Sequence, residues 1–208
     1  MSWAIVADSS CNLRSIEASD HSTEYSTVPL VIHVGGVDYV DDENLDVHEL
    51  NRIIAEEPEA SSSSCPSAGV WAEQFRKFDN VIAVTISANL SGSYEAATMA
   101  RNIVLDEYAR EHKGVISGKN IHLVDSRAAG GKLEVLVTEL SRYLNDNDPT
   151  FEQAVAFIDN IEEKSQVLFS LSSYENLTKN GRRCAAARRA AARHNPPDRQ
   201  TSAAGCRR

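Results

Sequence analysis

The sequence predicts a layered α/β domain, of the α/β/α kind, built around a mostly parallel sheet. Short apolar runs bounded by turns alternate with longer segments whose apolar residues recur at helical spacing. Near-continuous apolar runs suit strands buried on both faces of a parallel sheet, and strand–helix alternation is the pattern of such folds. The length of 208 residues allows one ordinary domain, or one domain and part of a second.

Five segments are expected to form strands. Each is rich in β-branched or other apolar residues and ends near a turn residue or an acidic residue. They are residues 3–7, 28–34, 81–86, 121–125 and 167–171. The sequence "GGVDYVDD" in residues 35–42 predicts a small hairpin at an edge of the sheet.

Apolar stripes and capping residues mark the helices between the strands. Asp46 with Glu49, and Thr150 with Gln153, have the spacing of capping pairs at helix starts. After each start, apolar residues recur every three or four positions, as on one face of a helix. The five helices are expected to begin near residues 47, 70, 92, 133 and 151.

Charge divides the chain into an acidic body and a basic tail. Residues 182–208 carry eight arginines and one aspartate, whereas residues 1–181 carry 13 basic and 29 acidic side chains. An acidic body would repel phosphates, which argues against nucleic-acid binding. The tail lacks large apolar residues, so we expect it to be disordered or non-native, as after a frameshift. The alternative is a basic arm for RNA or anionic lipid.

Several classes of protein find no support in the sequence. No stretch approaches the ~20 apolar residues of a membrane span, and the N-terminus lacks the features of a signal peptide, so we expect a cytoplasmic protein. The four cysteines form no C-x-x-C pair and have no histidine at ligand spacing, so no metal site is expected. Neither a P-loop nor a dinucleotide-binding loop is present, and no cofactor is expected.

Two serine-rich loops are the candidate ligand site. "SSSSCPSAG" in residues 61–69 and "SANLSG" in residues 87–92 each lead into an expected helix. In parallel α/β folds such loops gather at one edge of the sheet, where "DSS" at residues 8–10 and "DSRAAGG" at residues 125–131 also fall. Helix N-termini favour an anion and serine hydroxyls can donate to it, so carboxylate and phosphate would both fit.

A purely structural role for these serines is the alternative. Ser67 and Ser91 have the position of helix N-caps, and residues 61–64 the composition of a flexible loop. Asp8 and Asp125 are expected to serve turns at strand ends. Each of these residue types is common at such places without any ligand.

A serine-dependent hydrolase or transferase of small molecules is the competing function. "NLSGS" departs from the G-x-S-x-G nucleophile elbow. The histidines at positions 33, 48, 112 and 122 have no evident partner for a catalytic dyad, so we expect structural roles for them and no catalytic residue.

Six segments taken in order resemble the DegV family over residues 7–182. Residues 63–69 match the family pattern T-S-Q-P-S-x-G, and residues 86–97 match I-S-S-x-L-S-G-T-Y-x-x-A, which makes these two the most specific. The six segments are "VADSSCNL", "VPLVIHVGGVDYVDDENLD", "SSCPSAG", "ISANLSGSYEAA", "VDSRAAGG" and "YENLTKNGR".

The resemblance implies a two-domain α/β protein that binds a long-chain fatty acid. Some members carry the acid for a bacterial fatty acid kinase, whose ATP-dependent partner subunit phosphorylates the carboxylate, so the carrier is not itself the enzyme. The hydroxyls of Ser63, where the family has Thr, and of Ser91 are implied to bind the carboxylate. Cys65 stands where the family usually has Gln, and Arg182 is a possible further contact to the head group.

The C-terminal end departs from the family pattern. After Gly181 and Arg182 the family continues with an isoleucine and a further α/β domain, whereas here "RCAAARRAAARH" follows. We therefore expect a DegV-type first domain and the start of a connection in residues 1–181, a second domain that is missing or vestigial, and weak or absent lipid binding.

Overall fold

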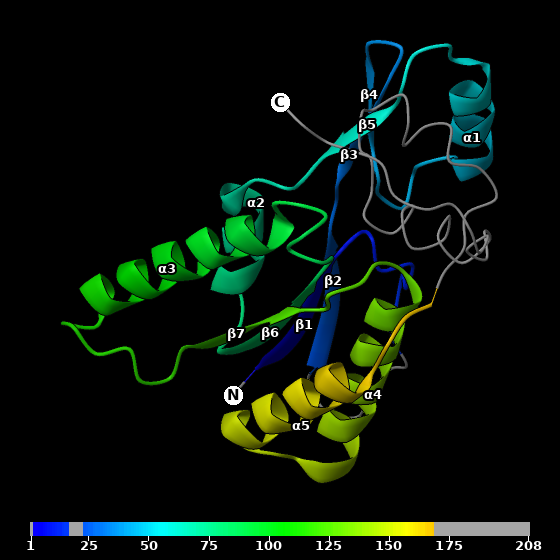
Figure 1. Cartoon of the computed structure of the whole chain (residues 1–208). Helices are drawn as coiled ribbons and strands as arrows, with labels where there is room; N and C mark the ends of the chain where they lie inside the picture. The colour runs from blue at the N-terminus through cyan, green and yellow to red at the C-terminus, as the bar shows by residue number, and fades with distance from the viewer. Residues whose placement is uncertain (1, 17–22, 169–208) are drawn as a thin grey trace, which may run out of the picture. The chain divides into compact units, whose positions relative to one another are not determined.

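The computed structural model describes residues 2–16 and 23–168 (Figure 1). Four strands form a parallel sheet in the order β2-β1-β6-β7, which confirms the predicted α/β class. These strands are β1 (Trp3–Asp8), β2 (Thr23–Val28), β6 (Asn80–Thr85) and β7 (Asn120–Asp125).

Helices cover both faces of this sheet (Figure 1). Ala4 and Val6 of β1 face one core, shared with α2 (Ala68–Arg76) and α3 (Ser93–Glu111). The alternate residues of β1 face a second core, shared with α4 (Gly131–Asn147) and α5 (Phe151–Lys164). Burial on both faces explains why the sequence of this strand is a continuous apolar run.

A second, smaller sheet holds the other three strands of the described residues. β3 (Val31–Val34) pairs antiparallel with both β4 (Val37–Val40) and β5 (Ser62–Ser64), in the order β4-β3-β5. The helix α1 (Val47–Glu56) follows β4 in the chain. The hairpin expected in residues 35–42 is therefore present, but it belongs to its own sheet and not to an edge of the parallel one.

Three expectations about strands were wrong or fall outside the structure. Residues 28–34 are not one buried strand, because β2 ends at Val28 and β3 begins after Pro29, whose nitrogen cannot donate to a ladder. Residues 61–64 are not a flexible loop, since β5 lies there. Of the strand expected at 167–171, residues 167 and 168 are not in a strand and the others lie outside the described residues.

The predicted helix starts are confirmed at both capping pairs. The side chain of Asp46 accepts hydrogen bonds from the amides of His48 and Glu49 at the start of α1. Thr150 and Gln153 form a complete capping box at the start of α5. None of the helices in the described residues combines the length and the apolar character that a membrane crossing needs.

Lys119 is a buried cation that closes the C-terminal end of α2. Its side-chain ammonium donates to the carbonyl oxygens of Phe75, at 2.6 Å, of Arg76, at 3.2 Å, and of Phe78. The last carbonyls of a helix have no intrahelical partner and favour a nearby positive charge. Burial lowers the pKa of Lys119, since desolvation disfavours the charged form.

We expect Lys119→Met to lower the free energy of unfolding by about 2 kcal/mol, because buried carbonyls would lose their donor. Urea unfolding measures this loss. Lys77→Met is the matched control, since among the described residues the exposed ammonium of Lys77 donates only to the side chain of Gln74. Equal effects of the two substitutions would contradict the role given to Lys119.

Candidate functional site

Asp8 joins three segments at the carboxyl edge of the parallel sheet. One oxygen of its buried carboxylate accepts from the Ile86 amide, at 2.8 Å, and from the Ser93 hydroxyl, at 2.7 Å. The other accepts from the hydroxyl and the amide of Ser10, at 2.5 and 3.3 Å. The carbonyl of Ser10 accepts in turn from the amide of Gly130, at 3.2 Å. Desolvation raises the pKa of Asp8 and outweighs the lowering by these hydrogen bonds.

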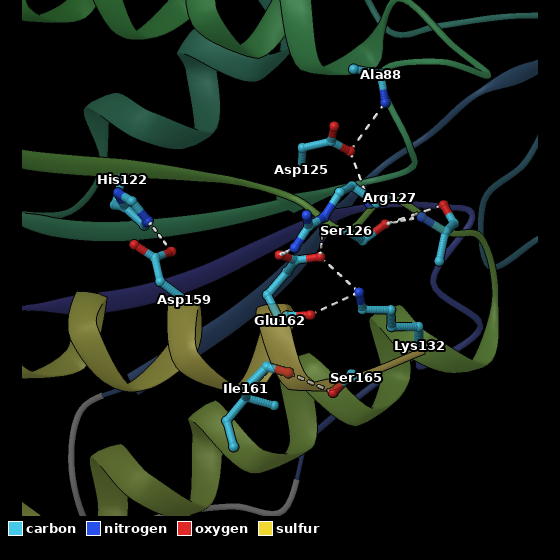
Figure 2. Close-up of polar contacts among 11 residues, drawn as sticks. Ala88, His122, Asp125, Ser126, Arg127, Lys132, Asp159, Ile161, Glu162 and Ser165 are labelled. Atoms are coloured by element: carbon cyan, nitrogen blue, oxygen red, sulfur yellow. Dashed lines mark hydrogen bonds and ion pairs between the residues drawn. The ribbon is translucent and has the colours of Figure 1, made fainter. Parts of the chain in front are cut away.

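The loops after β6 and β7 are also bonded to each other. The Ser87 amide donates to the carbonyl of Ala128 at 2.8 Å. Asp125 accepts from the amides of Ala88, at 3.1 Å, and Arg127, at 2.9 Å, as Figure 2 shows. The turn role expected for Asp125 is therefore confirmed, and it reaches across to the neighbouring loop. The loops that follow β1, β6 and β7 meet, as the rule for parallel sheets predicts.

The fourth loop reaches the same place through Cys65. This residue directly follows β5, and a Cβ atom added to Gly92 would lie only 3.2 Å from its sulfur. Gly92 is the N-cap of α3. The absence of a side chain at Gly92 thus lets the end of the small sheet approach the start of α3, and the two serine-rich segments come side by side.

Ser63 and Ser91 lie on these two segments. Ser63 is the exposed central residue of β5, and Ser91 is a half-buried residue just before α3. The Ser91 hydroxyl accepts from the amide of Ser93 at 3.3 Å, whereas Ser67 is the N-cap of α2 and accepts from the amide of Val70 at 3.5 Å. Among the described residues, the Ser63 hydroxyl has no hydrogen-bond partner and the Ser91 hydroxyl donates to none. Both hydroxyl protons are therefore available to an acceptor.

Comparison with known proteins identifies the family. A match to the family described as "Uncharacterised protein, DegV family" covers residues 2–187. The chain belongs to the DegV family. A DegV domain-containing protein of Streptococcus pyogenes is 37% identical over 182 residues, which are 88% of this chain and 62% of the relative. The chain thus spans 62% of the length of this curated relative.

Solved DegV structures have the same fold. The Streptococcus pneumoniae Fatty Acid Kinase (Fak) B3 protein, loaded with linoleic acid, matches with a TM-score of 0.81 and 35% identity, over 91% of this chain and 64% of that one. A DegV family protein from Eubacterium eligens, loaded with heptadecanoic acid, matches with a TM-score of 0.74 and 29% identity, over 89% and 62% of the two chains. The resemblance in the sequence is confirmed.

The role of Ser63 and Ser91 in this DegV chain stays a prediction. The contact between Cys65 and Gly92 brings their segments together, and it gives Cys65 a packing role at the position where the family usually has Gln. Arg182, the possible further contact to the head group, lies outside the described residues.

Two histidines of this DegV chain have carboxylate partners that the sequence analysis missed. His33 Nδ1 lies 2.6 Å from Asp38 Oδ1, and its Nε2 lies 3.0 Å from the hydroxyl of Ser64. His122 Nε2 lies 2.8 Å from Asp159 Oδ1 (Figure 2). The expectation that these histidines lack partners was wrong. The hairpin could have signalled the first pair, because positions 33 and 38 are opposite each other across a turn at Gly35 and Gly36.

A charge cluster joins the loop after β7 and the start of α4 to the end of α5, with Lys132 and Glu162 buried and Arg127 exposed (Figure 2). The Lys132 ammonium donates to Oε1 of Glu162, at 2.7 Å, and to its carbonyl, at 3.0 Å. The Arg127 guanidinium donates to both carboxylate oxygens of Glu162. Burial alone would raise the pKa of Glu162, but the hydrogen bonds from Arg127 and Lys132 outweigh it and lower that pKa. Sequence reasoning missed this cluster as well.

Two surface hollows in the described part of the chain lie away from Ser63 and Ser91. Each has a volume of about 200 Å³, below the roughly 300–1,000 Å³ of typical ligand pockets. One is lined by residues that include Leu13, Ile16 and Arg142, the other by residues that include Arg76, Glu107 and Lys119. No group of three or more His, Cys, Asp or Glu side chains in the described residues is arranged to hold a metal ion.

Proposed function

We propose that this DegV chain binds a long-chain fatty acid, more weakly than its longer relatives, with the carboxylate at the hydroxyls of Ser63 and Ser91. The observation that carries this proposal is the approach of Cys65 to Gly92, which brings the two serine segments to one edge of the sheet. The acids bound to the related proteins from Streptococcus pneumoniae and Eubacterium eligens, linoleic and heptadecanoic acid, support this class of ligand.

A carboxylate suits the chemistry of this edge. Ser63 and Ser91 offer two hydroxyl donors, and the start of α3 adds backbone amides and the positive end of a helix dipole. Hydrogen bonds from neutral donors to a charged acceptor are stronger than those between neutral groups. These neutral donors would therefore hold the head group without the help of a charged side chain among the described residues.

The face of the small sheet that carries Ser63 suits the first carbons of an acyl chain. Ser63 and Tyr39 are both paired with Ile32 in the ladder, so the three side chains lie on the same face. Each buried CH₂ group stabilises binding by about 0.8 kcal/mol, so the chain supplies affinity while the serines orient the head group.

The carboxylate would be presented to a partner. We propose that an ATP-dependent kinase subunit phosphorylates the bound acid to an acyl phosphate, and that this DegV chain performs no chemistry itself. The similarity to the Streptococcus pneumoniae Fak B3 protein supports a kinase partner. A carrier needs its head group at the surface for this reaction, and Ser63 is exposed.

We expect Ser63→Ala and Ser91→Ala each to weaken binding of hexadecanoic acid more than tenfold, because each removes a hydrogen bond to a charged group. Binding of hexadecanol should change little, since the alcohol carries no charge. Native mass spectrometry and calorimetric titration of the purified chain measure both ligands.

The matched controls are exposed serines that do not face the proposed carboxylate. Ser62 is exposed on the opposite face of β5, and Ser117 is exposed in the loop before β7, so alanine there should leave affinity unchanged. Unaltered acid affinity in the Ser91→Ala variant would refute the head-group assignment. Addition of ATP and a fatty acid kinase catalytic subunit should yield acyl phosphate only from chains that retain the acid.

A further inference from the structure

The sequence of β5 gives this strand little stability of its own. It has three residues, Ser62–Ser64, and all three are exposed. It lies at the edge of the small sheet and, among the described strands, pairs only with β3. A short edge strand with little apolar burial opens at low free-energy cost. Its neighbours must therefore fix its register.

His33 connects all three strands of this sheet. From β3, its ring reaches Asp38 on β4, at 2.6 Å, and the hydroxyl of Ser64 on β5, at 3.0 Å. The paired positions place these three side chains on one face of the sheet and Ser63 on the other. The bridge and the proposed carboxylate ligand are thus on opposite faces of the same three-residue strand.

Register decides which serine faces the ligand. Because side chains alternate along a strand, a slip by one residue would turn Ser63 to the face of His33 and would turn a neighbouring serine to the ligand. Consecutive serines offer no change in size or polarity that would prevent this slip. The bond from His33 to Ser64 opposes the slip that would pair Val31 with Cys65, because a thiol would then take the place of the Ser64 hydroxyl.

We propose that His33 is a positioning residue that locks β5 in register through Ser64 and so holds the Ser63 hydroxyl toward the carboxylate. This inference rests on the proposed function. The lock does not depend on the protonation of the ring. When His33 is neutral, Nδ1–H donates to Asp38 and Nε2 accepts from Ser64; when it is charged, both nitrogens donate.

The order Asp38–His33–Ser64 is also the order of acid, base and nucleophile in a catalytic triad. Its side chains are open to water, with exposed fractions of 36% for His33 and 69% for Asp38. Catalytic triads act where a buried acid orients the base and water is excluded, so exposure favours the positioning role. Catalysis by Ser64 becomes an outcome that the test can detect.

The test is a cycle of substitutions read out with two ligands. Ser64→Ala should weaken binding of hexadecanoic acid about fivefold, the effect of one lost hydrogen bond of average strength. It should have no further effect in the Ser63→Ala background and should leave hexadecanol binding unchanged. A general loss of structure would weaken binding of both ligands. Ser64→Thr keeps the hydroxyl and should restore wild-type affinity, and Ser62→Ala is the control within the same strand.

A second readout needs no lipid. In the free chain, the amides of residues 62–64 should exchange with deuterium several-fold faster in Ser64→Ala and His33→Ala than in Ser62→Ala, because local opening becomes easier. Equal exchange in all three variants would overturn the proposal. Labelling of Ser64 by a fluorophosphonate that is lost in His33→Ala would also overturn it, by making Ser64 a nucleophile.

The outcomes separate this inference from the function on which it rests. Failure of the wild-type chain to bind hexadecanoic acid contradicts the proposed function, and the exchange measurement still decides the role of His33. Binding that Ser63→Ala leaves intact contradicts the head-group assignment. A fivefold loss in Ser64→Ala that disappears in the Ser63→Ala background supports both.

Discussion

Glu162→Gln is expected to lower the free energy of unfolding by about 3 kcal/mol, because it would leave the buried ammonium of Lys132 without its carboxylate. The Lys132 side chain is 6% exposed and the Glu162 side chain 11%, so water cannot replace the lost partner. Urea unfolding at neutral pH measures the loss. Glu163→Gln is the matched control, since it makes the same change of charge at the adjacent exposed position.

Acid should remove the same contribution in the wild-type chain. The pKa of Glu162 lies below its ordinary value of 4.5, so its pairing stabilises the fold fully above that value and is lost as pH falls through the lowered pKa. The difference between wild type and Glu162→Gln should therefore shrink in acid. Replacement of both partners, as Lys132→Met with Glu162→Leu, should cost little, because no buried charge remains. A gap that widens in acid would contradict the assignment.

Most of the fold follows from apolar pattern, and the exceptions have physical causes. β1 and β6 are near-continuous apolar runs because helices cover both of their faces. β2 escaped prediction because its sequence, "TEYSTV", is largely polar, as suits a strand at the edge of the sheet with only part of its length buried. The prediction of a single strand over residues 28–34 was wrong because apolar content does not show where Pro29 interrupts the hydrogen bonds between strands.

The candidate site was likewise predictable only in part from the sequence. The convergence of the loops after β1, β6 and β7 follows from the rule that parallel strands end together, so residue types and order were enough to predict it. The fourth loop follows β5 of the small antiparallel sheet, and that rule does not explain its approach. The partners of Glu162 were not predictable, because a glutamate near the end of an amphipathic helix has the pattern of a solvent-exposed charge. Lys132 is 30 positions away in the sequence, and only the packing of α5 on α4 brings the two together.

Asp8→Asn is the second substitution with a large expected effect, again about 3 kcal/mol of lost stability. Each carboxylate oxygen of Asp8 accepts two hydrogen bonds, one from a backbone amide and one from a serine hydroxyl. An asparagine can accept at only one of these places, so its NH₂ group must face the amide of either Ser10 or Ile86. The start of α3 would lose its anchor at Ser93, and the affinity for hexadecanoic acid should fall with it.

Asp125→Asn is the matched control for this change, since Asp125 also ends a strand but accepts with a single oxygen, which an asparagine retains.

The pH dependence of the effect of Asp8→Asn gives a further test. Burial raises the pKa of Asp8 above its ordinary value of 3.8, so its protonation stabilises the fold fully below that value, and this contribution is lost as pH rises through the raised pKa. A protonated carboxyl can still accept at both oxygens, whereas an amide nitrogen cannot. The stability gap between wild type and Asp8→Asn should therefore be widest in acid and narrow toward neutral pH, the reverse of the trend at Glu162. A gap that is constant with pH, or no larger than that of Asp125→Asn, would show that the Asp8 carboxylate does not hold these three segments together.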